Sequence, residues 1–201
     1  MPMSKGILMV VSGPSGAGKS TVVQELVAQT EGTYLSISVT TRSPRPFEKQ
    51  GEHYYFVSES EFRSMIEGGE LLEYAEYAGN FYGTPAVEVD KMLSEGKDVI
   101  LEIDIQGGLQ VKERRPDVVL AFLIPPTVEE LESRLRLRGS ESEMTIRKRL
   151  EIAEREYKNV SQYDYVVVND NVEDAAARLQ AILVAERCSA KRVNPKDIKK
   201  C

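Results

Sequence analysis

Residues 13–20 read Gly-Pro-Ser-Gly-Ala-Gly-Lys-Ser and match the pattern G-x-x-x-x-G-K-[ST]. Before them, Ile7–Val11 is a short and wholly apolar run, which is typical of a strand buried on both faces. After them, Ser20–Gln29 repeats its apolar residues at helical spacing. Glycines between a strand and a helix let successive backbone N–H groups point at phosphate oxygens, and the helix adds its positive end. The stretch therefore predicts a nucleotide-binding loop.

Each part of this loop has an expected role. The Lys19 ammonium is expected to reach the β- and γ-phosphates, and the Ser20 hydroxyl to ligate Mg²⁺. The residues expected to bind the nucleotide are Gly13, Pro14, Ser15, Gly16, Ala17, Gly18, Lys19, Ser20 and Thr21. A chance match to the pattern occurs in about 1 chain of 100 of this length, but this one lies where the mechanism needs it. The loop alone does not name the group that accepts the phosphate.

Strands and helices are expected to alternate along much of the remaining chain. Further buried strands are predicted over Val99–Ile103, Val118–Ile124 and Tyr165–Val168. Helical patterns cover Val87–Glu95, Val128–Arg138, Glu143–Lys158 and Val172–Arg187. This alternation predicts an α/β fold with a parallel sheet covered by helices on both faces.

Residues 34–84 do not fit that alternation. They are rich in Ser, Thr, Tyr, Arg and Gly, with alternating runs at Tyr34–Thr40 and Tyr54–Val57 and a helical pattern at Glu59–Glu67. We interpret them as a small, mostly β insertion into a single domain. The expected core is about residues 5–35, 86–136 and 150–190, the β-rich insertion 36–85, a polar lid 137–149, and a disordered basic tail 191–201.

Composition narrows the class of protein. The 201 residues carry a net charge of −6 at pH 7, whereas general nucleic-acid binders present a basic face. The two cysteines, Cys188 and Cys201, have neither metal-ligand spacing nor a framework of bridges, which favours a reducing compartment. Met1–Lys5 is too short and polar for a secretory signal, and no apolar run reaches the ~18 residues that span a bilayer. We expect a cytoplasmic protein that binds neither nucleic acid nor membrane, and leave the oligomeric state open.

Two charged patterns outside the loop have both a functional and an ordinary interpretation. Arg42 and Arg45 lie three apart around Pro44, a spacing that suits binding of a phosphate dianion but also occurs in solvated basic turns. Glu102 and Asp104 lie two apart at the end of a predicted strand, so their side chains share a face. They could hold Mg²⁺-bound water, contact the acceptor, or cap the next turn.

Several stretches, in order from about Ile7 to Arg187, closely resemble the signatures of guanylate kinases. They are SVTTRSPR at 38–45, YYFV at 54–57, EYAEYAGNFYGT at 73–84, LEIDIQG at 101–107 and RGSESEMTIRKRL at 138–150, after GPSGAGKS at 13–20. The resemblance implies transfer of the γ-phosphoryl group of ATP to GMP, with dGMP as a further acceptor and Mg²⁺ as cofactor. The sequence departs from the family pattern at Phe47, where glycine is common, and at His53, where an acidic residue is more usual.

The resemblance also implies roles for matching residues. Arg42, Arg45, Tyr54 and Tyr82 match groups that hold the GMP phosphate, and Ser38, Glu73 and Thr84 match groups that recognise guanine, with Glu102 and Asp104 beside them. Arg138 and Arg149 match lid arginines, so the expected catalytic groups are Lys19, Arg42, Arg138 and Arg149. Asn169 matches a segment near the adenine of ATP, but would equally suit a cap for the helix at Val172.

The chemistry of guanine supports the role of Glu73, because guanine offers two adjacent donors to a carboxylate that can only accept. Adenine would present an acceptor at the same place, which a buried carboxylate rejects. The alternatives are a kinase for another nucleoside monophosphate and a non-catalytic interaction module of the same fold. Intact Lys19 and Ser20 favour the enzyme over the module.

Overall fold

The computed structural model describes residues 5–77, 79–137 and 142–192. Its main sheet is parallel throughout and has the strand order β2-β7-β1-β8-β9. The strands are β1 (Leu8–Ser12), β2 (Thr33–Leu35), β7 (Asp98–Glu102), β8 (Val119–Ile124) and β9 (Tyr165–Val168). The parallel sheet confirms the predicted α/β class, and each apolar run named above supplies one strand.

Helices cover both faces of this sheet because successive residues of each strand point to opposite sides. On one face, Met9 and Val11 of β1 pack in a cluster with α1 (Lys19–Gln29) and α7 (Val172–Arg187). On the other face, Leu8 and Val10 pack with α3 (Ala86–Ser94) and α4 (Ile105–Arg114). Among the described residues, no helix is long and apolar enough to cross a membrane.

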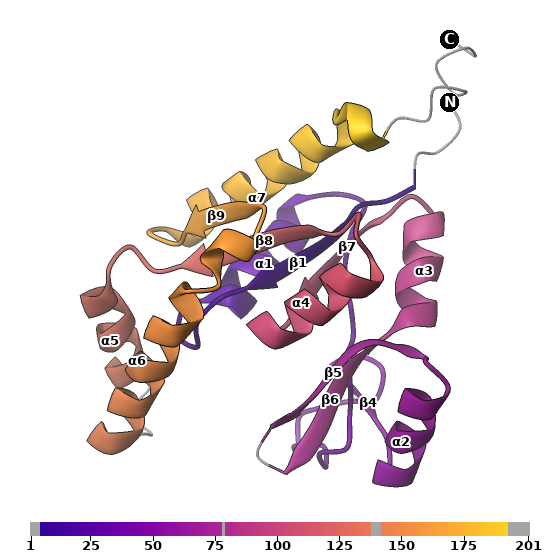
Figure 1. Ribbon diagram of the computed structural model, residues 1–201, viewed down its shortest axis with the longest axis horizontal. Helices are drawn as coiled ribbons and strands as arrows, with labels where there is room; N and C mark the ends of the chain where they lie inside the picture. Colours follow the sequence, from indigo (N-terminus) through magenta and orange to yellow (C-terminus); the bar gives the residue numbers. More distant parts are fainter. Residues whose placement is uncertain (1–4, 78, 138–141, 193–201) are drawn as a thin grey trace.

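A second, smaller sheet has the order β4-β3-β6-β5 and lies to one side of the main sheet (Figure 1). Its strands are β3 (Val39–Thr40), β4 (Tyr55–Phe56), β5 (Leu71–Tyr77) and β6 (Asn80–Pro85). Helix α2 (Glu59–Glu67) begins with a capping box between Ser58 and Glu61 and buries Phe62 against the sheet. Helices α5 (Val128–Leu137) and α6 (Glu143–Tyr157) pack on each other and form a separate hydrophobic cluster. Two short 3₁₀ turns are η1 (Val160–Gln162) and η2 (Ala190–Arg192).

Three features differ from the sequence-based expectation. The run Tyr34–Thr40 is not one strand, because Thr33–Leu35 pairs with β7 in the main sheet and only Val39–Thr40 joins the small one. Helix α4 was not predicted, because two glycines weaken the helical pattern of residues 105–114. Lys191 and Arg192, expected in a disordered tail, lie in η2, where Arg192 binds Glu186; the rest of that tail lies outside the described residues.

Candidate functional site

The phosphate loop lies between β1 and α1, as predicted. Gly13 and Gly18 adopt φ values of 150° and 88°, a region that favours glycine. A Cβ atom at Gly13 would lie 2.0 Å from the carbonyl oxygen of Leu123, and one at Gly18 would lie 2.4 Å from the Asn169 amide nitrogen. The glycines therefore permit both the turn and its close packing on neighbouring strand ends.

The side chains of this loop gather around a pocket of 220 Å³, which we call the loop pocket. It is lined by Ser15, Gly16, Gly18, Lys19, Ser20 and Thr21 from the loop and the start of α1, and by Glu102 from β7. Lys19 Nζ donates to the Gly13 and Pro14 carbonyls at 2.6 and 3.2 Å. Ser20 Oγ donates to Glu102 Oε1 at 2.5 Å, so the first turn of α1 is joined to the end of β7.

Asn169 holds the back of the loop. It is buried, and its Nδ2 donates to the Ala17 carbonyl at 2.7 Å. The alternative that Asn169 caps the following helix is wrong, because Asn171 caps α7 by accepting from Asp174 N. Arg134 of α5 donates to the Asn169 carbonyl at 3.0 Å and thereby joins α5 to this corner.

A second pocket of 260 Å³ lies between the two sheets, and we call it the inter-sheet pocket. Ser38, Tyr54, Glu73 and Tyr82 line it from the small-sheet side, and Glu102 and Asp104 from the end of β7. Thr84 is not part of the lining but contacts Glu73, because Thr84 Oγ1 donates to Glu73 Oε1 at 2.7 Å. Glu102 thus lines both pockets, which places them next to each other.

Glu73 is the buried carboxyl of the inter-sheet pocket, with 5% of its surface exposed. Burial raises its pKa from 4.5 to about 7; the negative charge of Asp104 adds to the rise, whereas the Thr84 hydrogen bond opposes it. A Cβ atom at Gly107 of α4 would lie 2.8 Å from Glu73 Oε2. The glycine that weakens the helical pattern of α4 therefore makes room for this carboxyl.

Arg42 is held by an acidic partner that the sequence analysis missed. Its guanidinium donates to both oxygens of Glu48 at 2.9 Å, to the Ser43 carbonyl at 2.8 Å, and lies 5.4 Å from the centre of the Tyr54 ring. Glu48 also accepts from the backbone N–H of Arg45 at 2.8 Å. The Arg42 hydrogen bonds lower the pKa of Glu48 to about 2, so the carboxylate is charged at neutral pH.

The remaining predicted residues lie as follows. Arg149 of α6 donates to Ser15 Oγ at 2.7 Å and so reaches the phosphate loop, whereas Arg138 lies outside the described residues. Asp104 caps α4 by accepting from Gly107 N at 2.7 Å, so the capping interpretation holds for Asp104 although it also lines the inter-sheet pocket. The Arg45 side chain is exposed.

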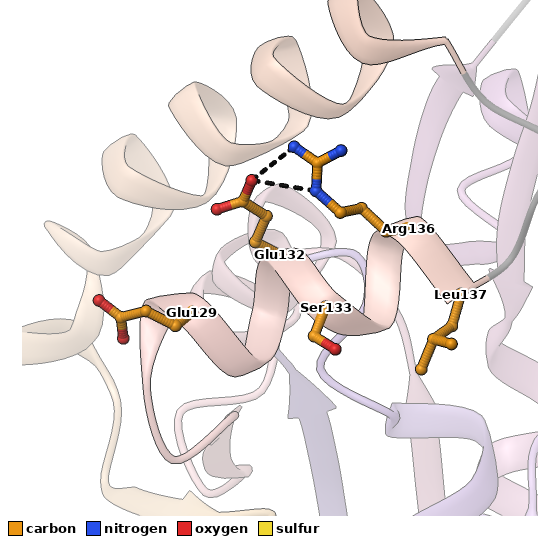
Figure 2. Close-up of a pocket in the computed structure, with 5 residues that line it drawn as sticks. All are labelled: Glu129, Glu132, Ser133, Arg136 and Leu137. Carbon is orange, nitrogen blue, oxygen red and sulfur yellow. Dashed lines mark hydrogen bonds and ion pairs between the residues drawn. The ribbon is translucent and has the colours of Figure 1, made fainter.

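A larger pocket of 380 Å³ on α5 is lined by none of the residues predicted to bind substrate or to act in catalysis. Figure 2 shows its lining, in which Arg136 donates to Glu132 at 2.7 Å on the helix surface.

Phe47 and His53, where the sequence departs from the family pattern, contact each other with ring centres 6.5 Å apart. His53 Nδ1 also accepts from Lys49 N, so these residues shape the turn before β4.

The donor set of the loop pocket suits magnesium. Among the described residues, no group of three or more His, Cys, Asp or Glu side chains could hold a metal by itself. Mg²⁺ in phosphate-transferring sites needs only one or two protein oxygens, since phosphates and water complete its shell. Ser20 Oγ would supply such an oxygen, and Glu102 Oε1, 2.5 Å from it at the mouth of the loop, would accept from a water of the ion's shell.

A parallel sheet whose first strand leads into a glycine loop and Lys19-Ser20, with a second pocket beside that loop, defines a P-loop nucleotide-binding protein of the α/β class. A model of the family described as guanylate kinase matches residues 5–186. The chain belongs to the guanylate kinase family, which confirms the resemblance seen in the sequence.

Individual relatives agree with the family match. The chain is 54% identical over 192 residues to a guanylate kinase of Desulfitobacterium hafniense (strain Y51), covering 96% of both chains. It is 50% identical over 190 residues to one of Clostridium perfringens (strain 13 / Type A), covering 94% of this chain and 88% of the relative. The crystal structure of guanylate kinase from Anaplasma phagocytophilum superposes with a TM-score of 0.78 at 36% identity, covering 98% of this chain and 95% of that one.

Proposed function

We infer that this chain transfers the γ-phosphoryl group of ATP to GMP, giving ADP and GDP. The observation that carries this conclusion is the shared wall at Glu102, which lines both the loop pocket and the inter-sheet pocket. A donor phosphate in the first and an acceptor phosphate in the second would meet at that wall. Transfer between them then depends on positioning and charge stabilisation.

The inter-sheet pocket is proposed to select guanine through Glu73. Once ionised, its buried carboxylate can accept from both N1–H and the exocyclic amine of guanine, while Thr84 holds its other side. We assign Ser38 to the base edge as well, because it lines the same pocket. None of these groups requires a ribose 2′-hydroxyl, so dGMP is an expected acceptor.

The acceptor phosphate is assigned to Arg42, Arg45, Tyr54 and Tyr82. Support comes from Arg42, whose guanidinium is fixed by Glu48 and by the Tyr54 ring at the edge of the inter-sheet pocket. A bidentate guanidinium suits a phosphate dianion. The acceptor oxygen is already anionic near neutral pH, since the second pKa of a phosphate monoester is about 6, and no side chain need deprotonate it.

The donor phosphates are assigned to the loop 13–21 and Lys19, with Asn169 at the adenine side. Arg149 contacts the loop at Ser15 and is a proposed catalytic group together with Lys19, Arg42 and Arg138. These cations would stabilise charge on the transferring group. We also propose that residues 36–85 form the GMP-binding insertion, that 137–149 act as a lid, and that the protein works in the cytoplasm.

Ser20 is proposed to ligate Mg²⁺, with Glu102 or Asp104 holding a water of its shell. The chemistry that the ion supplies is neutralisation of charge on the β- and γ-phosphates. The hydrogen bond between Ser20 and Glu102 orients both oxygens toward the loop pocket.

A coupled assay of ADP formation tests the function, with ATP, Mg²⁺ and each of GMP, AMP, CMP and UMP. We expect fast turnover with GMP alone, lost in Lys19→Ala. Fast turnover with another monophosphate would overturn the assignment of Glu73, and no turnover with any of them from folded protein would overturn the proposed function.

A further inference from the structure

Two tyrosines and one glutamate join the two sheets, and none of the three lines the loop pocket or the inter-sheet pocket. Glu88 lies in the first turn of α3, and its Oε1 accepts from Tyr34 Oη at 2.5 Å and from Tyr55 Oη at 3.0 Å. Tyr34 belongs to β2 of the main sheet, whereas Tyr55 belongs to β4 of the small sheet. One carboxylate oxygen therefore links both sheets and α3. We call this group the Glu88 junction.

The two tyrosines come from different hydrophobic cores. Tyr34 packs against the cluster that contains β1, β7 and α3, and Tyr55 packs against the cluster of Val39, Phe62 and Leu71 in the small sheet. Both phenols are partly buried. Burial, and after it the hydrogen bond to Glu88, raises the pKa of each tyrosine, so both remain protonated donors at neutral pH.

The path of the chain connects this junction to the inter-sheet pocket. The chain leaves the main sheet through residues 36–38 and returns where β6 meets α3 at Pro85 and Ala86. The Glu88 junction spans both connections, because Tyr34 lies just before the first and Glu88 just after the second. Ser38 in the first connection lines the inter-sheet pocket, and its carbonyl accepts from Tyr55 N at 2.9 Å.

We propose that Glu88 is a positioning residue that sets where the small sheet, with its acceptor-binding side chains, stands relative to the phosphate loop. This rests on the proposed function, in which Glu73 and Tyr82 of the small sheet bind GMP and the main sheet binds ATP. Loss of the junction misplaces the acceptor while leaving the loop pocket unchanged. It therefore raises the KM for GMP and lowers kcat without changing the KM for ATP.

Steady-state kinetics of Tyr34→Phe, Tyr55→Phe, Glu88→Ala and Glu88→Gln test the proposal. We expect the KM for GMP to rise about threefold in each tyrosine variant and about tenfold in Glu88→Ala, with the KM for ATP within about twofold. Because both phenols donate to one oxygen, the double tyrosine variant should match Glu88→Ala. Glu88→Gln keeps an acceptor of the same size, so it should fall between the wild type and Glu88→Ala even if the alanine variant folds poorly.

Tyr165→Phe is the matched control, because it removes a phenol–carboxylate bond of 2.7 Å to Glu186 on β9 and α7. It should change neither KM. The proposal is overturned if the junction variants raise the KM for GMP no more than this control, or if the KM for ATP rises in parallel. An active wild type with those results overturns this inference alone, whereas a folded wild type without GMP-dependent turnover overturns the proposed function as well.

Discussion

Replacing Glu73 by glutamine is predicted to stabilise the unliganded protein in a pH-dependent way. Burial raises the Glu73 pKa from 4.5 to about 7, so the folded state binds the proton more tightly than the unfolded state. The carboxyl contributes its full stability below pH 4.5 and loses it as pH rises through 7. At 1.36 kcal/mol per pKa unit, the loss is about 3 kcal/mol. Glutamine is neutral at every pH, and its amide oxygen can still accept from Thr84.

Urea unfolding of the wild type and Glu73→Gln between about pH 4 and 8.5 measures this difference. We expect equal free energies of unfolding at the acid end and a variant more stable by about 3 kcal/mol above pH 8. Glu76→Gln, the same change at an exposed position of β5, is the control and should shift the free energy of unfolding by less than about 0.5 kcal/mol throughout. A Glu73→Gln difference that does not change with pH would refute the argument from burial.

Substitutions at three further positions test other contacts. Ser20→Ala should lower kcat/KM about 100-fold in steady-state assays while Ser20→Thr retains activity, because a hydroxyl is needed to ligate Mg²⁺; equal activities would contradict this. Asn169→Ala leaves the Ala17 carbonyl without its 2.7 Å donor, so it should lower the free energy of unfolding by about 1–3 kcal/mol and raise the KM for ATP but not for GMP. Glu48→Gln removes the charge that pairs with Arg42 and so weakens the two hydrogen bonds that hold the guanidinium in place. The KM for GMP should therefore rise about fivefold with little change in melting temperature. An unchanged KM would show that this ion pair does not contribute to acceptor binding.

The parts of the fold that were predictable from sequence are those set by local pattern. The phosphate loop could be located because its glycines, Lys19 and Ser20 are consecutive, and the buried strands because their apolar runs are uninterrupted. The pattern of Tyr34–Thr40 does not show that the run divides between the two sheets, because the place of β2 depends on pairing with β7, more than 60 residues later. Helix α4 was missed because Gly107 weakens the helical pattern, and the reason for a glycine there is the room that the distant Glu73 carboxyl needs.

The site was predictable only as far as the signature stretches reach. They contain the predicted residues that line the two pockets, such as Lys19, Glu73 and Glu102, but do not show the contacts that fix these side chains. Glu48 could have been suspected as an acid six residues after Arg42, yet the turn that brings them together has no simple signal. Asn169 and Asn171 both precede α7, and only the structure decides that Asn171 is the cap.

Transfer of a phosphoryl group from ATP in the loop pocket to GMP in the inter-sheet pocket can be followed with a label on the γ-phosphate. The protein is incubated with ATP labelled at the γ-phosphate, Mg²⁺ and GMP, and the nucleotides are then separated. We predict that label appears in GDP in an amount equal to the ADP formed, with little inorganic phosphate released when GMP is omitted. Label that stays in ATP, or that enters inorganic phosphate equally fast with and without GMP, would contradict transfer between the two pockets.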